Sequence, residues 1–167
     1  TVTAVIPFYE KFMKRFPTVT TLANAELSEV IEHWAGLGYY SRARSLHKSA
    51  KHLNEIGRFP ETHTELLELP GFGPYTARAV SSLAFAEKVG VVDGNVIRVL
   101  SRVFDLDLDW WRSNERDRLQ ALADALAQAK IKTKSADPSD VNQALMELGA
   151  TVCTPKSPTC LLCPWLS

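Results

Sequence analysis

The stretch Leu69-Pro-Gly-Phe-Gly-Pro-Tyr-Thr-Ala77 decides how this chain folds. Its two glycines flank one bulky residue and permit backbone conformations that are closed to other residues. The turn opens into residues 76–84, whose apolar spacing predicts an amphipathic helix. Such a turn leaves backbone N–H groups free at the helix start, where they can bind a phosphate.

A single carboxylate follows this turn closely. Asp93 lies in Val91-Val-Asp-Gly-Asn-Val96, at the expected N-terminal end of another helix. A phosphate-binding turn and a lone acid this close together indicate chemistry on nucleic acid. The alternative is an ordinary helix–turn–helix in which Asp93 only caps its helix. Spacing alone leaves both interpretations open.

The rest of the sequence predicts helices and no strand, because no run alternates with a period of two. Pro7 is expected at the first position of the first helix. Ser139 or Asp140 is expected to cap the last helix, which ends at Gly149. The fold class is therefore all-α, with two lobes that meet near residues 88–95. Other helices are expected over residues 28–34, 41–54, 64–68, 94–104 and 113–127.

Charge and hydropathy limit the possible partners. The 19 basic and 19 acidic residues of this 167-residue chain cancel, so any nucleic-acid surface must be local. No apolar run approaches the ~20 residues that span a bilayer, and no signal-peptide pattern appears. We expect a monomeric cytoplasmic or nucleoid protein that does not bind membranes.

A second glycine turn carries two aromatic residues, Tyr39 and Tyr40, directly before a basic helix. Aromatic side chains beside such a helix can wedge between bases while its cations, Arg42 first among them, hold the phosphates. The alternative is two core aromatics followed by a solvated charged face.

All three cysteines lie near the end of the chain, as Cys153-x6-Cys160-x2-Cys163. Three cysteines cannot all pair in disulfides, and thiolates at this spacing can surround a zinc ion or an iron–sulfur cluster. The pattern favours a metal site over free thiols and leaves the metal open.

These motifs together resemble those of the helix-hairpin-helix DNA glycosylases, and within them the MutY-type adenine DNA glycosylases. The resemblance runs over nearly the whole chain. It rests on the glycine turn, the Asp93 segment and the cysteine spacing, and on Gly36-Leu-Gly-Tyr-Tyr-Ser-Arg-Ala-Arg44 and Asn142-Gln-Ala-Leu-Met-Glu-Leu-Gly-Ala150. It implies base excision repair of adenine mispaired with 8-oxoguanine or guanine in double-stranded DNA.

The resemblance implies three catalytic positions. Asp93 matches the carboxylate that stabilises the positive sugar formed as adenine leaves, a task like that in glycoside hydrolysis. Asn95 matches an asparagine beside that acid and the sugar. Tyr75 stands where endonuclease III-like enzymes carry a lysine that forms a Schiff base with the sugar. Tyrosine cannot form that imine, so the resemblance implies a glycosylase without lyase activity.

Further positions are implied to touch DNA. Gly71 and Gly73 match the hairpin that grips the phosphate backbone, and Tyr39 matches a tyrosine that wedges into the duplex beside 8-oxoguanine. Gln143 falls where the family has a residue facing the extruded adenine. The base must leave the stack because its glycosidic bond is otherwise inaccessible.

The family fold implies a helical barrel lobe over residues 1–90, with the helix-hairpin-helix at 69–84, and a helical lobe over 91–167 with the cysteine cluster. Cys153, Cys160 and Cys163 then match ligands of a 4Fe–4S cluster, with zinc as the alternative.

Three family features have no match in these 167 residues. They are the glutamate that protonates adenine, a fourth cluster cysteine, and the domain that reads 8-oxoguanine. We therefore expect a truncated catalytic region that is inactive or nearly so by itself, because protonating the leaving base is much of the reaction. Two other classes remain: an endonuclease III-like lyase, and a non-enzymatic helix-hairpin-helix module with a zinc site.

Overall fold

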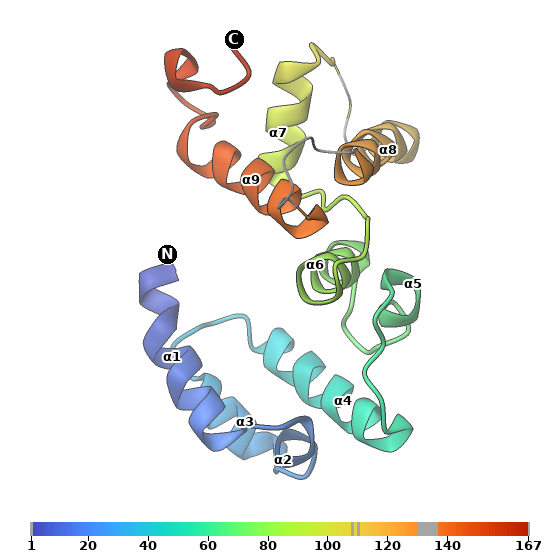
Figure 1. Ribbon diagram of the computed structural model, residues 1–167. Helices are drawn as coiled ribbons and strands as arrows, with labels where there is room; N and C mark the ends of the chain where they lie inside the picture. The colour runs from blue at the N-terminus through green and yellow to red at the C-terminus, as the bar shows by residue number, and fades with distance from the viewer. Residues whose placement is uncertain (1, 108, 110, 130–136, 167) are drawn as a thin grey trace. The chain divides into compact units, whose positions relative to one another are not determined.

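The computed structural model describes residues 2–107, 109, 111–129 and 137–166, with only the backbone for residues 2 and 3. These residues form helices and no strand, so the predicted all-α class is confirmed (Figure 1). The helices are α1 (Val2–Arg15), α2 (Val19–Ala23), α3 (Leu27–Trp34), α4 (Tyr40–Ile56), α5 (His63–Leu66), α6 (Pro74–Phe85), α7 (Gly94–Val103), α8 (Ser113–Gln128), α9 (Pro138–Thr151) and the 3₁₀ turn η1 (Cys160–Leu162).

The chain divides into two compact units, Thr1–Pro60 with Thr64–Gly73, and Glu61–His63 with Pro74–Ser167. We call them unit 1 and unit 2. The chain enters unit 2 briefly at Glu61–His63 and passes into it for the rest of its length between Gly73 and Pro74, inside the glycine turn. The resemblance implied a different division, with one lobe over residues 1–90 and the other over residues 91–167. That division follows the family fold, and it stays a prediction.

Unit 1 is built around α4, against which α2 and α3 pack, while α1 packs on α3. Its core joins Phe16, Leu22, Val30 and Ala50 from these four helices and their connections. Phe16 follows α1 directly, and its ring lies 4.9 Å from that of Phe12. Burial of these side chains fixes α4, which carries the basic residues.

Unit 2 is built around α7, which packs against α9, and α9 also contacts α6 and α8. Val96, Val99 and Leu100 of α7 are fully buried, together with Leu119 of α8. A fully buried side chain of this size contributes about 1.5–3 kcal/mol relative to an exposed one. The N-terminal end of α7, where Asp93 lies, is therefore attached to a helix that the core holds firmly.

Two helix starts differ from the prediction. Helix α1 begins at Val2, so Pro7 lies inside it and removes one internal hydrogen bond of the helix. Helix α9 is capped by Asp137, not by Ser139 or Asp140. Pro138 takes the first helical position, and Asp140 completes a capping box with Asp137. Among the helices that the structure describes, none is long and apolar enough to cross a membrane.

Candidate active site

Asp93 lies at the N-terminus of α7 and caps it. Its Oδ1 accepts a hydrogen bond of 2.8 Å from the amide of Val96, and its Oδ2 accepts a longer one of 3.3 Å from Nδ2 of Asn95. The helix dipole stabilises an anion at this end. Capping engages one oxygen of the carboxylate and leaves the other with only the longer hydrogen bond, so the two interpretations of the sequence do not exclude each other.

The side chain of Asn95 is oriented by Arg98, one turn further along α7. The guanidinium donates a hydrogen bond of 2.8 Å to Oδ1 of Asn95 and one of 2.6 Å to the carbonyl of Gly149 on α9. It also donates to the carbonyl of Cys153 at 2.7 Å. Since the amide oxygen faces Arg98, the amide nitrogen faces Asp93. The sequence analysis did not identify Arg98.

Gly149 allows this approach of α9 to α7. A Cβ atom built on Gly149 would lie 2.6 Å from Cβ of Asn95 and 3.0 Å from its Cα. Real Cβ atoms do not approach other atoms so closely, and the obstacle at Asn95 is partly backbone. Position 149 is thus restricted to glycine by the same residue that supports the carboxylate.

Tyr75, in the first turn of α6, lies in the electrostatic field of Asp93. Burial raises the pKa of its hydroxyl, and the negative charge of Asp93 raises the pKa further. The hydroxyl therefore stays protonated at neutral pH and is available as a hydrogen-bond donor beside the carboxylate. The structure thus brings Asp93, Asn95 and Tyr75, the three predicted catalytic residues, into one neighbourhood of unit 2.

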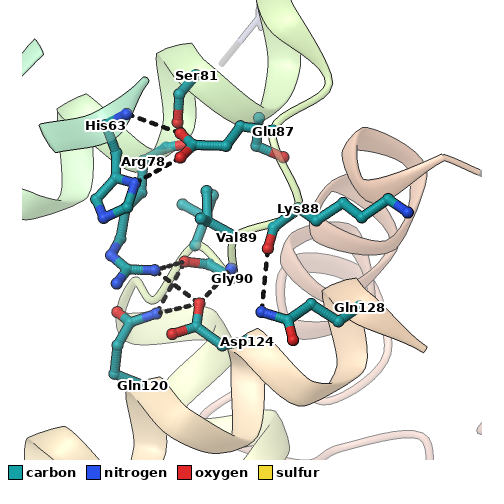
Figure 2. A network of polar contacts seen from close by, with 12 residues as sticks. His63, Arg78, Ser81, Glu87, Lys88, Val89, Gly90, Gln120, Asp124 and Gln128 are labelled. Atoms are coloured by element: carbon teal, nitrogen blue, oxygen red, sulfur yellow. Dashed lines mark hydrogen bonds and ion pairs between the residues drawn. The ribbon is translucent and has the colours of Figure 1, made fainter. Parts of the chain in front are cut away.

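The segment that leads from α6 to Asp93, residues 87–92, is irregular and is held by side chains (Figure 2). We call it the approach segment. The amide of Gly90 donates to Oδ1 of Asp124 at 2.7 Å, and its carbonyl accepts from Gln120 at 2.9 Å. Asp124 also pairs with Arg78 at 2.6 Å. A side chain at position 90 would collide with the backbone of Ala123.

The first residue of the approach segment, Glu87, is anchored as well. Its carboxylate accepts from the backbone amide of His63 at 2.7 Å and from the imidazole Nδ1 at 2.8 Å (Figure 2). Burial works to raise the pKa of Glu87, but hydrogen bonds from Ser81 and His63 outweigh it and hold the pKa below its usual value. The one signal in the sequence was Gly90, because a glycine in a non-helical run often marks a place where another segment, here Ala123 of α8, comes close to the backbone.

Gln143, expected to face adenine, lies exposed on α9. Its amide nitrogen donates to Oγ of Ser139 at 2.9 Å, one turn earlier on the same helix. Nothing in this geometry restrains Gln143 against another part of unit 2, so its expected role stays a prediction.

In unit 1, Tyr39 precedes α4 in a left-handed conformation with φ of 48°. It is 78% exposed, and the guanidinium of Arg42 lies 4.9 Å from the centre of its ring. This conformation is costly for a residue with a side chain. The aromatic ring and the cation are thereby presented together on the surface.

The two glycines of the hairpin have different surroundings. Gly71 has φ of +82°, and any Cβ there would collide with Ser45 of α4. Gly73 faces open space, with nothing within 4 Å of a Cβ built on it. Ser49 of α4 further holds the turn by donating to the carbonyl of Pro70 at 2.7 Å. Gly71 therefore serves the packing of the hairpin, while Gly73 leaves its outer surface clear.

The three thiols offer suitable donors without forming a metal-binding group. Cys153 and Cys163 are partly buried and Cys160 is exposed, all as free cysteines. No three His, Cys, Asp or Glu side chains of the described residues are placed to hold one ion. Arg102 donates to Sγ of Cys153 at 3.5 Å and to the carbonyl of Thr154 at 2.8 Å. The three thiols therefore do not form a preorganised set of metal ligands in this structure.

Comparison with known proteins agrees with this geometry. Residues 1–128 match the HhH-GPD superfamily of base excision DNA repair proteins. The chain is 48% identical to the adenine DNA glycosylase of Rattus norvegicus and 47% identical to that of Homo sapiens, in each case over 98% of this chain but only 31% and 29% of the relative. It is 42% identical to the adenine DNA glycosylase of Schizosaccharomyces pombe, over 94% of this chain and 34% of that one. The chain thus spans about a third of the length of these curated relatives.

Solved structures show the same fold. A thermostable thymine-DNA glycosylase matches with a TM-score of 0.83 at 30% identity, covering 99% of this chain and 74% of that one. Endonuclease III in a non-covalent complex with DNA matches with a TM-score of 0.77 at 26% identity, again over 99% and 74%. The resemblance drawn from the motifs is confirmed: the chain belongs to the HhH-GPD superfamily of base excision DNA repair proteins.

Proposed function

We propose that this chain is the catalytic region of an adenine DNA glycosylase, which removes adenine paired with 8-oxoguanine or guanine in duplex DNA. The observation that carries the proposal is Asp93, whose carboxylate caps α7 through one oxygen and leaves the other with only a long hydrogen bond to Asn95. The names of the curated relatives support adenine as the base.

In the proposed reaction the bond between C1′ of the sugar and N9 of adenine breaks. The electron pair leaves with adenine, and the sugar becomes an oxocarbenium cation. The Asp93 carboxylate faces that cation and stabilises it electrostatically. Water then adds to C1′ and loses a proton. Asp93 remains an anion throughout, so the proton taken up by adenine comes from another group.

Tyr75 distinguishes the proposed glycosylase from one that also has lyase activity. A lyase of this type needs an amine that attacks C1′ and forms an imine. The hydroxyl of Tyr75, kept protonated by burial and by Asp93, is neither an amine nor an oxyanion nucleophile at neutral pH. It can donate a hydrogen bond to the carboxylate or to the sugar.

DNA binding is proposed to use Tyr39, Arg42 and the hairpin glycines Gly71 and Gly73. The supporting features are the exposed ring of Tyr39, the adjacent cation of Arg42 and the open space around Gly73. Amides of a glycine turn bind phosphate, and an aromatic wedge can open the stack beside the mispair. Gln143 is proposed to contact the extruded adenine.

The cysteines are proposed as ligands of a 4Fe–4S cluster, supported by three thiol donors within one short segment. Zinc is the alternative. Iron, acid-labile sulfide and zinc measured in the natural protein decide between them.

The test of the function is single-turnover base release by the natural polypeptide that contains residues 1–167. Duplexes carry adenine opposite 8-oxoguanine, guanine or thymine, and residues 1–167 alone are assayed in parallel. We expect release from the first two duplexes, no release by residues 1–167 alone, and no covalent adduct after borohydride treatment.

Each rival class has its own outcome in this test. A borohydride-trapped adduct would indicate a lyase, and DNA binding without release of any base by the natural polypeptide would indicate a binding module. Release of a different base would keep the glycosylase chemistry of Asp93 and reject adenine as its substrate.

A further inference from the structure

Asn142 is a polar side chain of unit 2 that makes three hydrogen bonds. It lies on α9 and is fully buried. Its Nδ2 donates to the carbonyl of Val89 at 2.9 Å and to Oγ of Ser82 at 2.7 Å, and its Oδ1 accepts from the amide of Val91 at 2.9 Å. These three hydrogen bonds keep their partner groups in place, because breaking any of them would leave a buried polar group unsatisfied.

What Asn142 binds is the backbone of the approach segment. In an extended chain, the carbonyl of one residue and the amide of the second residue after it point to the same side. Val89 and Val91 present such a pair, and the carboxamide of Asn142 bonds both members. It thus takes the place of the N–H and C=O groups that one residue of a neighbouring parallel strand would offer.

The position of this contact matters because Val91 is only two residues before Asp93. Seven residues after Asn142, on the same face of α9, Gly149 packs against Asn95, two residues after Asp93. Helix α9 therefore holds the chain on both sides of the carboxylate, by hydrogen bonds before it and by backbone contact after it.

We propose that Asn142 is a positioning residue for Asp93: its amide sets the path of the approach segment and thereby the place of the carboxylate. Asn142 does not itself touch the reacting atoms. This inference rests on the proposed function, because the position of Asp93 matters to the reaction only if its carboxylate acts on the sugar.

The first test is Asn142→Asp, which keeps the shape of the side chain and the acceptor for Val91 but loses the donor to Val89. Because a displacement of about 1 Å can slow a reaction about 100-fold, we expect a loss of this order in the single-turnover rate. Affinity for the mispaired duplex should change less than about threefold, since the groups proposed to hold DNA are untouched.

Leu145→Ala is the matched control. Leu145 lies one turn along the same buried face and belongs to the core of unit 2, without a hydrogen bond to the approach segment. Its truncation destabilises the same helix by leaving a cavity. Rates are compared at conditions where urea titration shows both variants folded. A rate loss in Asn142→Asp no greater than in Leu145→Ala would overturn the proposal.

Hydrogen exchange on the unsubstituted protein gives a second, substrate-free measurement. The amide of Val91 should exchange as slowly as the buried amides of α9. In a folded Asn142→Asp variant, which keeps the acceptor for Val91, the amide of Val96 bonded to Asp93 should lose protection while α8 keeps it. Val91 exchanging as fast as an exposed loop amide in the unsubstituted protein would contradict the proposal, even if the variant fails to fold. Because this measurement needs no base release, failure of the proposed function remains distinguishable from failure of this inference.

Discussion

Two irregular segments each precede a side chain for which we propose a function, and they are built in opposite ways. The approach segment before Asp93 is clamped by side chains from α6, α8 and α9, and Val91 in it is fully buried. The turn at residues 36–39 instead depends on left-handed backbone at Gly36, Gly38 and Tyr39, and ends in an exposed ring. The carboxylate proposed to stabilise the sugar cation follows a segment held by several side chains, whereas the ring proposed to enter the duplex is left exposed at the expense of backbone strain.

The largest effect should come from Asp93→Asn, at the end of the clamped segment. Asparagine is as good a helix cap as aspartate, so stability should hardly change. Loss of the negative charge should slow adenine release by about 10²–10³-fold or more. Single-turnover kinetics and urea unfolding measure the two properties separately. A folded variant with undiminished release would remove Asp93 from the mechanism.

Gly149→Ala should disturb the same carboxylate from the other side. The added methyl group meets Asn95, so we expect about 1–3 kcal/mol of lost stability from overpacking. Release should also slow by about 10- to 100-fold, because α7 must shift. Gly94→Ala, at an open position of the first turn of α7, is the control for stability. Equal effects of the two substitutions would contradict the close packing.

Tyr39→Gly should have opposite effects on folding and on binding. Glycine adopts the left-handed conformation without strain, so stability should rise by about 1 kcal/mol. Binding of the mispaired duplex should weaken about tenfold, since stacking of an aromatic on a base contributes about 1–3 kcal/mol. Tyr9→Ala removes another exposed tyrosine of unit 1 and should leave binding unchanged. Urea unfolding midpoints measure the expected gain in stability, and fluorescence anisotropy measures the expected loss of duplex binding.

Glu87→Gln should have the smallest effect and one that depends on pH. Because the folded protein holds the pKa of Glu87 below its usual 4.5, its stabilising contribution is present above that value and is lost as the pH falls through the folded-state pKa. We expect the variant to be less stable by about 1 kcal/mol at pH 7, with the difference vanishing in acid. Urea midpoints at both pH values measure it. A difference that persisted in strong acid would exclude the carboxylate as its cause.

The sequence predicted the helices and the start of α7 well, because apolar periodicity and capping residues are local signals. It placed Pro7 and the cap of α9 wrongly, since nearby residues offered plausible starts. It could not show which side chains hold the approach segment in place. Asn142 and Asp124 act across 51 and 34 positions of the chain, and no periodicity connects residues so far apart.

The hairpin also shows that a sequence motif does not reveal tertiary contacts, even for two glycines only two residues apart. Gly71 and Gly73 are equivalent in the motif, yet only Gly71 has a positive φ and a neighbour that excludes a side chain. The neighbour is Ser45, from a helix whose packing the motif does not contain. The sequence therefore marks both glycines of the turn but could not show that only Gly71 is required by packing, and their expected contact with DNA stays a prediction.

The cap that Asp93 forms on α7 and the charge proposed to act on the sugar belong to one side chain, which has a consequence for natural variation at this position. Under the proposed function, a substitution that keeps the cap and removes the charge, such as Asp93→Asn, is expected to give a folded protein that binds the mispair and does not release the base. A substitution that also loses the cap, such as Asp93→Val, gives less protein. Under the proposed function, the chemically milder change is therefore expected to be the more obstructive one, because a folded and inactive protein can remain bound to the mispair.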